Sequence, residues 1–154
     1  MSAEKKPVVA ITIGDPAGIG PEITVATMMD KSVYDECKPF LIGSVPIISR
    51  AMKIMGCDFA IHKIAHPQEA RFSWGTLDVL ETGDYDCDSI EWGKVQKLAG
   101  QMSLDYVMKS IELGKAGLID VVSTAPIHKE AIKLAGCKPV SYTHLRAHET
   151  CADL

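Results

Sequence analysis

The 154-residue chain lacks the features that mark several classes of protein. It has no cluster of Lys and Arg, and its formal net charge of -4 does not suit a protein that coats nucleic acid. Its longest apolar runs, such as residues 7–13, are far too short to span a bilayer. Residues 1–6 are charged and polar, and Gly14 and Asp15 interrupt the apolar stretch behind them, which is not the pattern of a signal peptide.

Cysteine pairs at metal-binding or redox spacing are also missing. The five cysteines are odd in number and contain no CxxC motif: Cys37, Cys57, Cys87, Cys137 and Cys151. A dispersed and odd set argues against a disulfide framework and against a zinc knuckle. We therefore expect reduced thiols, as in a cytosolic protein.

The order of the apolar segments predicts an α/β fold. The β-branched run at residues 7–13 (PVVAITI) is typical of a strand that is buried on both faces. Further strands are predicted at residues 39–42, 58–64, 77–80 and 118–123, the last of them also buried. Helices are predicted at residues 45–55, 94–114 and 128–135, and the two apolar sides of residues 94–114 predict a helix buried between layers. Alternating strands and helices indicate a mostly parallel sheet with flanking helices.

Residues 14–22 (GDPAGIGPE) form a glycine-rich loop between a predicted strand and a predicted helix. The glycines let the backbone turn sharply and approach a ligand, and the free N–H groups of the following helix can bind an anion. The loop is not a Walker loop, because no Lys-Ser or Lys-Thr follows, and its glycine spacing does not match the dinucleotide fingerprint. Asp15 either contacts a ligand or caps a backbone N–H in a tight turn, and the spacing leaves both open.

Residues 123–130 (STAPIHKE) form a second loop that leaves a strand and enters a helix. Ligands of parallel α/β sheets gather at the carboxyl ends of strands, so chemistry is expected at these two loops. Thr124 offers a polar group, Lys129 can hold a phosphate as a point charge, and His128 can donate to a phosphate or shuttle a proton. The alternative is that His128 begins a helix and Lys129 is solvated.

The other histidines are weaker candidates. His62 and His66 lie in or after a predicted strand with no partner carboxylate nearby, so we expect them to be structural or exposed. His144 and His148 have the i, i+4 spacing with which two helical histidines share a metal. The metalloprotease pattern requires Glu directly after the first histidine, where this chain has Leu145, so we expect an unstructured tail.

The two loops together resemble landmarks of the 4-hydroxythreonine-4-phosphate dehydrogenase family. GDPAGIGPE after an amino-terminal strand is similar to the opening motif of that family. Residues 93–136 resemble its next landmark, in which a helix led by Gly-Lys runs into a strand and then into a turn similar to TAPINKEA. The resemblance covers residues 7 to about 140. It implies an isocitrate-dehydrogenase-like fold, with residues 1–140 as the amino-terminal part of a two-domain dehydrogenase.

The resemblance also implies an activity. The family oxidises the hydroxyl of 4-phosphohydroxy-L-threonine with NAD or NADP, and the β-keto acid then loses carbon dioxide, which feeds pyridoxal phosphate biosynthesis. A divalent metal (zinc, magnesium or cobalt) held by histidines acts as a Lewis acid. The implied enzyme is a cytoplasmic homodimer with a small phosphorylated substrate, without nucleic-acid or membrane partners. Its active site lies between domains and takes metal ligands from both subunits.

Only a few residue roles carry over. Substrate binding is implied for Asp15, Thr124, His128 and Lys129, although the family usually has Asn where this chain has His128. The next motif of the family, Gly-His-Thr-Glu, would fall at residues 141–144, where only Thr143 matches and becomes a fifth candidate for substrate binding. The metal histidines and the main cofactor contacts are expected beyond this point. Residues 7–140 are therefore assigned no metal ligand, no cofactor contact and no catalytic residue.

The resemblance stops after Val140. Residues 141–150 (SYTHLRAHET) look like a translated sequencing adapter, so we interpret residues 141–154 as a non-family tail of artefactual origin and expect a truncated, inactive chain. Three alternatives remain open: a dehydrogenase of a four-carbon sugar-acid phosphate, an enzyme similar to phosphate acyltransferases, and an inert fragment. The amino-terminal motifs do not separate the two dehydrogenase substrates. Metal histidines in the continuation of the gene would separate a dehydrogenase from an acyltransferase.

Overall fold

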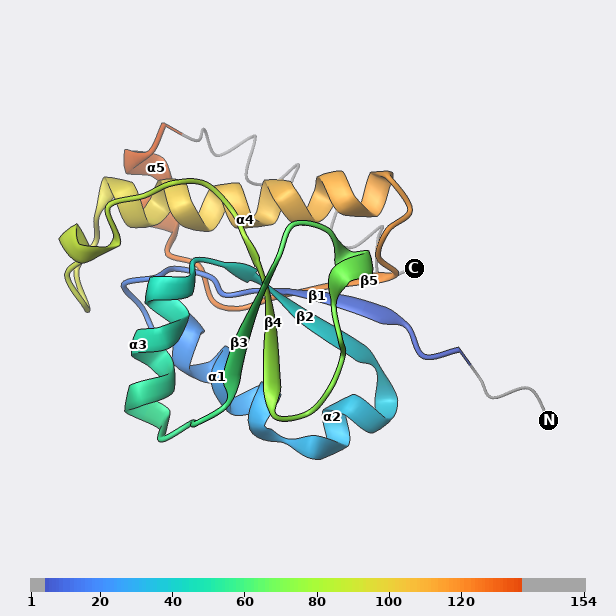
Figure 1. The fold of residues 1–154 in the computed structure, drawn as a ribbon. Coiled ribbons are helices and arrows are strands. Elements are labelled where there is room, and N and C mark those ends of the chain that lie inside the picture. Colours follow the sequence, from blue (N-terminus) through green and yellow to red (C-terminus); the bar gives the residue numbers. More distant parts are fainter. Residues whose placement is uncertain (1–4, 137–154) are drawn as a thin grey trace.

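Five parallel strands form the centre of the fold, in the order β3-β4-β2-β1-β5 (Figure 1). The computed structural model describes residues 5–136. The strands are β1 (Val8–Thr12), β2 (Lys38–Gly43), β3 (Ala60–Ile64), β4 (Thr76–Glu81) and β5 (Val121–Thr124). The predicted α/β class, with a parallel sheet and flanking helices, is confirmed.

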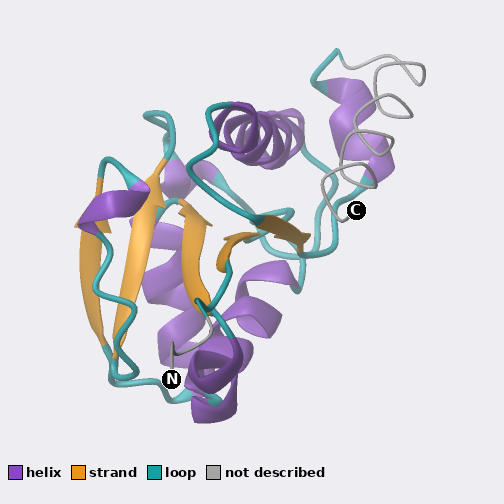
Figure 2. Ribbon diagram, turned by 90° about the vertical axis from the view of Figure 1, so that its right-hand side faces the viewer, coloured by secondary structure: helices purple, strands orange, loops and turns teal. Residues whose placement is uncertain are grey.

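Helices cover both faces of this sheet. They are α1 (Gly20–Met29), α2 (Lys31–Glu36), α3 (Val45–Met55), α4 (Lys97–Lys115) and α5 (Lys129–Leu134), with short 3-10 turns at Pro67–Glu69 and Cys87–Ser89. Helices α4 and α5 lie on one side of the sheet, and α1, α2 and α3 lie on the other (Figures 1 and 2). Helix α2 was not expected from the sequence, although Asp30 caps it by accepting the N–H of Ser32.

The core lies around β2 and β1, two of the three inner strands of the sheet. In β2, Phe40, Leu41 and Ile42 are fully buried, and in β1 Ala10 is fully buried as well. Parallel strands covered by helices on both faces bury successive side chains instead of alternate ones. The prediction of a doubly buried strand at residues 7–13 is therefore confirmed for β1, apart from its half-buried first two residues.

The last strand differs from its prediction. A buried strand was expected at residues 118–123, but β5 is Val121–Thr124 and its side chains are half-buried or exposed. Within residues 5–136, β5 pairs only with β1, so it lies at an edge of the sheet and neighbours cover it less completely. Asp120 precedes the strand: its N–H donates to Val8 O (2.9 Å), and its Oδ2 accepts the N–H of Val8 (2.8 Å).

Helix α4 is not buried between two layers, as its two apolar sides had predicted. Met102 and Tyr106 are fully buried on the side that faces the sheet, whereas Met108 on the other side is 48% exposed. The helix also begins at Lys97 instead of residue 94, because the Gln96 side chain closes the preceding turn through two hydrogen bonds to the Glu91 backbone. No helix within the described residues is both long and apolar enough to cross a membrane.

Candidate functional site

The two candidate loops leave the sheet at the same level. Thr12, the last residue of β1, pairs with Thr124, the last residue of β5. Beyond this pair, the N–H of Ala125 donates to Thr12 O (3.0 Å), and the N–H of Asp15 donates to Pro126 O (3.0 Å). The structure thus brings together the loops at residues 14–22 and 123–130, which are more than 100 positions apart in the sequence.

Glycine makes this close approach possible. Gly14 has a φ of +75°, a region that favours glycine, and a Cβ at this position would overlap the carbonyl oxygen of Pro126. At Gly20, a Cβ would overlap the carbonyl oxygen of Ile13. Two glycines of the GDPAGIGPE motif are therefore needed for backbone contacts inside the protein, whether or not a ligand is bound.

Asp15 lies inside a tight turn and is only 5% exposed. Its Oδ1 accepts the N–H of Ala17 (2.7 Å), and its backbone carbonyl accepts the N–H of Gly18 (3.0 Å). Among the described residues, no donor is hydrogen-bonded to Oδ2. Of the two alternatives open from the sequence, the capping of a backbone N–H is observed, and ligand binding by the same carboxylate stays a prediction.

Two segments outside the motif hold this turn from behind. The guanidinium of Arg50 in α3 donates from Nη2 to Pro16 O (2.9 Å), and the N–H of Gly93 donates to Ala17 O (2.8 Å). The Arg50 guanidinium also stacks over the ring of Trp92, 4.3 Å from the ring centroid. Sequence reasoning did not find Arg50 or Trp92, because neither belongs to a local motif and the contacts join distant segments.

The second loop ends where α5 begins. His128 is the N-cap residue of α5 and is exposed, as is Lys129, the first residue of that helix. The alternative in which His128 begins a helix is therefore observed, while the predicted contacts with a phosphate stay a prediction. Thr124 is half-buried at the end of β5. The fifth candidate, Thr143, lies outside the described residues, as do His144 and His148.

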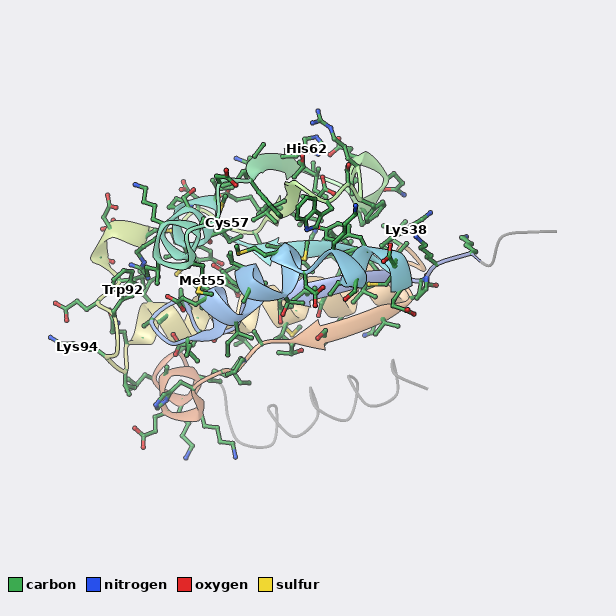
Figure 3. The ribbon with its side chains drawn as sticks, turned by 90° about the horizontal axis from the view of Figure 1, so that it is seen from below. Lys38, Met55, Cys57, His62, Trp92 and Lys94 are labelled. Atoms are coloured by element: carbon green, nitrogen blue, oxygen red, sulfur yellow. The ribbon has the colours of Figure 1, made fainter. Side chains whose placement is uncertain are left out.

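The expectation that His62 has no partner carboxylate is wrong. Its Nδ1 lies 2.7 Å from Oδ1 of Asp78, because the parallel pairing of β3 and β4 places these two residues opposite each other. Asp78 is 1% exposed and its Oδ2 also accepts the N–H groups of Arg71 and Phe72. A buried carboxylate with three donors is a structural anchor. Figure 3 shows His62 well apart from Trp92, and so from the turn at Asp15.

A second group of polar side chains follows β2. Ser44 and Tyr106 are both buried, and their hydroxyl oxygens lie 2.5 Å apart. The Tyr85 hydroxyl donates to Oδ2 of Asp105. Burial raises the pKa of the Tyr106 hydroxyl and of the Cys87 thiol above their ordinary values. The Tyr106 hydroxyl and the Cys87 thiol are therefore neutral near pH 7, and Ser44 and Tyr106 are hydrogen-bonded to each other, which favours a structural role.

A metal centre requires several His, Cys, Asp or Glu side chains close together. Across residues 5–136, no three or more His, Cys, Asp or Glu side chains come together in a way that could hold a metal ion. The three described cysteines, Cys37, Cys57 and Cys87, are free thiols. The candidate residues at the carboxyl ends of β1 and β5 are therefore one carboxylate, one hydroxyl, one imidazole and one ammonium group: Asp15, Thr124, His128 and Lys129. This set suits a small anionic substrate better than a metal.

Comparison with known proteins gives consistent relatives. A Clostridium botulinum protein, provisionally named D-threonate 4-phosphate dehydrogenase, is 37% identical over 145 residues, which is 94% of this chain and 43% of that protein. The crystal structure of a 4-hydroxythreonine-4-phosphate dehydrogenase from Burkholderia phymatum is 36% identical, with a TM-score of 0.88 over 96% of this chain and 44% of its own. A Salmonella typhimurium structure, provisionally given the same enzyme name, has a TM-score of 0.83 at 34% identity, over 94% of this chain and 45% of its own.

This chain spans less than half the length of these relatives. Residues 35–153 match the family described as Pyridoxal phosphate biosynthetic protein PdxA. The matched range includes residues 141–153, whose interpretation as a non-family tail stays a prediction. Because the match covers more than half of the chain, the chain belongs to the PdxA family.

Proposed function

We propose that this chain supplies the substrate-binding edge of an NAD- or NADP-dependent dehydrogenase that oxidises 4-phosphohydroxy-L-threonine in pyridoxal phosphate biosynthesis. The observation that carries the proposal is the hydrogen bond between the Asp15 N–H and Pro126 O (3.0 Å), which joins both family loops at one edge of the sheet. Family membership adds to this, and it favours a dehydrogenase over a phosphate acyltransferase. The relatives are more than twice as long, so activity is proposed for the whole protein, as a homodimer, and not for this part alone.

The chemistry of the loops suits a phosphorylated hydroxy acid. Lys129 supplies a positive charge for the phosphate, and His128 supplies an imidazole N–H beside it at the start of α5. Asp15 and Thr124 supply oxygen acceptors for the hydroxyl or amino groups of the substrate. Thr143 lies outside the described residues, in the segment interpreted as a non-family tail, so the proposed substrate-binding set consists of these four residues.

Two further groups belong to the proposed reaction. When bound, NAD or NADP would take the hydride, and a divalent metal such as zinc, magnesium or cobalt would polarise the oxygen that is oxidised. Residues 5–136 do not fit a metal, since they contain no suitable cluster of ligands. Neither loop has the glycine spacing of the dinucleotide fingerprint. We therefore assign to the described residues the binding and orientation of the substrate, and no step of hydride transfer.

A second substrate has support of its own. The Clostridium botulinum relative is provisionally named for D-threonate 4-phosphate, a phosphorylated four-carbon sugar acid. The two substrates share a phosphate, a hydroxyl and a carboxylate, and they differ in the amino group. The candidate residues would meet the groups that the two substrates share, so they suit either substrate.

The test measures reduced nicotinamide by absorbance, with each substrate, NAD or NADP, and added divalent metal. The assay compares this chain with the protein read from the same gene with its native sequence after Val140. Activity in the longer protein that a chelator abolishes would support the proposal, and activity with neither substrate would refute it. Lys129→Met should raise KM at least tenfold, whereas Lys133→Met, an exposed lysine of the same helix, should leave KM unchanged.

A further inference from the structure

We propose that Arg50 is a positioning residue for this site, because it sets the orientation of the Asp15 carboxylate through the peptide between Pro16 and Ala17. The inference rests on the proposed function of the loop at residues 14–22. Arg50 lies in the middle of α3, and its guanidinium contacts the turn at one point, the carbonyl oxygen of Pro16. It therefore acts on the carboxylate without touching it.

The geometry of one peptide unit links the two side chains. The carbonyl of Pro16 accepts from Nη2 of Arg50 (2.9 Å), and the N–H of Ala17, in the same planar unit, donates to Oδ1 of Asp15 (2.7 Å). In a trans peptide the C=O and the N–H point in opposite directions. Arg50 and Asp15 thus hydrogen-bond to opposite sides of the same planar peptide group. A rotation of that peptide group would break both hydrogen bonds together.

Arg50 is itself held in place. Its guanidinium stacks over Trp92, and the neighbouring Gly93 donates its N–H to Ala17 O (2.8 Å), so the same segment supports the arginine and the turn. Partial burial lowers the pKa of the Arg50 guanidinium, and the nearby negative charge of Glu22 opposes this shift. One oxygen of Glu22 is buried and has no hydrogen-bond partner among the described residues. Glu22 therefore attracts the cation while Nη2 of Arg50 donates to Pro16 O.

The surroundings of Arg50 also place it at the site. Figure 3 shows Trp92 at the opposite end of the molecule from Lys38, the first residue of β2. Trp92 therefore lies at the end where the parallel strands reach their carboxyl termini. The Ala17 hydrogen bond uses only Oδ1 of Asp15, and Oδ2 takes no hydrogen bond from the described residues. A fixed Oδ1 therefore gives the second oxygen a fixed direction toward a ligand. Without Arg50, the peptide and the carboxylate rotate, and a ligand must order them.

An arginine suits this role better than a lysine. Its planar group can stack on an indole ring and donate in a fixed direction at the same time, whereas an ammonium group is compact and strongly hydrated. Both Arg50→Met and Arg50→Lys should therefore lower kcat/KM of the longer protein by about 10- to 100-fold, the loss expected when a group that positions the substrate is displaced slightly. Lys53→Met is the matched control, because Lys53 is an exposed cation in the last turn of the same helix.

A double-mutant cycle tests whether Arg50 acts through Asp15. If it does, Asp15→Asn and Arg50→Met should each lower kcat/KM, and the double variant should lose little more than Asp15→Asn alone. A merely structural arginine would give additive losses, and additivity would overturn the proposal. Lys53→Met combined with Asp15→Asn should give the loss of Asp15→Asn alone.

A second measurement does not depend on activity. Amide hydrogen exchange of this chain, followed by NMR, should show faster exchange at Ala17 and Gly18 in Arg50→Met and Arg50→Lys than in Lys53→Met. Unchanged exchange at Ala17 in Arg50→Lys would overturn the positioning role, even if Arg50→Met failed to fold. If the longer protein is inactive but exchange at Ala17 does rise, the proposed function fails while the positioning of Asp15 by Arg50 stands.

Discussion

A single glycine in α4 decides where α5 can lie. Gly100 is buried, and a Cβ at this position would overlap the carbonyl group of Ala131 in α5. Gly114 lies in the last turn of the same helix and would meet no atom within 4 Å. The two glycines therefore form a matched pair for one substitution, Gly→Ala, in one helix.

The expected effects have opposite signs. In a helix, Ala is favoured over Gly by about 0.5–1 kcal/mol, so Gly114→Ala should raise the free energy of unfolding by roughly that amount. In Gly100→Ala, the overlap with backbone must be relieved by a shift of α5, and such overpacking costs about 1–3 kcal/mol. The shift also exposes part of Ile132, now 3% exposed, whose full burial contributes about 1.5–3 kcal/mol. We expect a net loss of about 2 kcal/mol.

Urea unfolding of the chain, followed by circular dichroism, measures both values. If α5 detaches alone, the global midpoint will move little, but amide exchange across Lys129–Leu134 will become faster in Gly100→Ala only. The reasoning is refuted if Gly100→Ala is as stable as Gly114→Ala and protects α5 as well as the unsubstituted chain does. In the longer protein, Gly100→Ala should also weaken substrate binding, since α5 carries His128 and Lys129.

Three further predictions concern the turns and the edge of the sheet. Gly14→Ala should lower the free energy of unfolding by about 3 kcal/mol through strain and overlap, whereas Gly56→Ala, with a similar φ of +67° and open space around it, should lower it by about 1 kcal/mol in urea unfolding. His62→Ala should lower it by about 1–3 kcal/mol in the same assay, because Oδ1 of buried Asp78 then loses its partner, and an unchanged midpoint would contradict the anchor. The backbone N–H groups of Ala65 and His66 lower the pKa of Glu69 below 4.5 in the folded state. The ionised Glu69 therefore stabilises the fold above about pH 4.5, and this stabilisation is lost as the pH falls through the pKa of the folded state. The urea midpoint of Glu69→Gln should lie below that of the unsubstituted chain at pH 7, and the two should converge in acid.

Much of the fold was predictable because its signals are local. The β-branched run before Gly14 predicted β1, and the ranges predicted for α3 and β4 agree with the structure to within about a residue. The errors arose where neighbours in space decide. β5 lies at an edge of the sheet within the described residues, so an apolar run that reads as a buried strand is only half-covered. Helix α4 has two apolar sides, and only one of them faces the sheet.

The site was predictable as two loops, but not as one arrangement. The rule that ligands gather at carboxyl ends of strands placed the two loops at one edge of the sheet, and the hydrogen bond from the Asp15 N–H to Pro126 O confirms that they meet. The rule did not reveal that Asp15 caps Ala17, nor that Arg50 holds the other side of that peptide. These contacts depend on the directions of individual groups, which side-chain type and spacing do not specify.

The sequence by itself determined the class of fold, the order of its elements apart from α2, and the family, because periodicity, turn residues and motifs depend on neighbouring positions. Only the tertiary structure decided which distant groups meet: Asp15 with Pro126, Arg50 with Pro16, and His62 with Asp78. The register of parallel strands brings His62 to Asp78 and Asp15 to Pro126, and the packing of α3 brings Arg50 to Pro16. A local pattern carries no record of register or of helix packing. The physical reason is that strand pairing and helix packing are settled by the whole core at once, while each hydrogen bond at the site follows from that result.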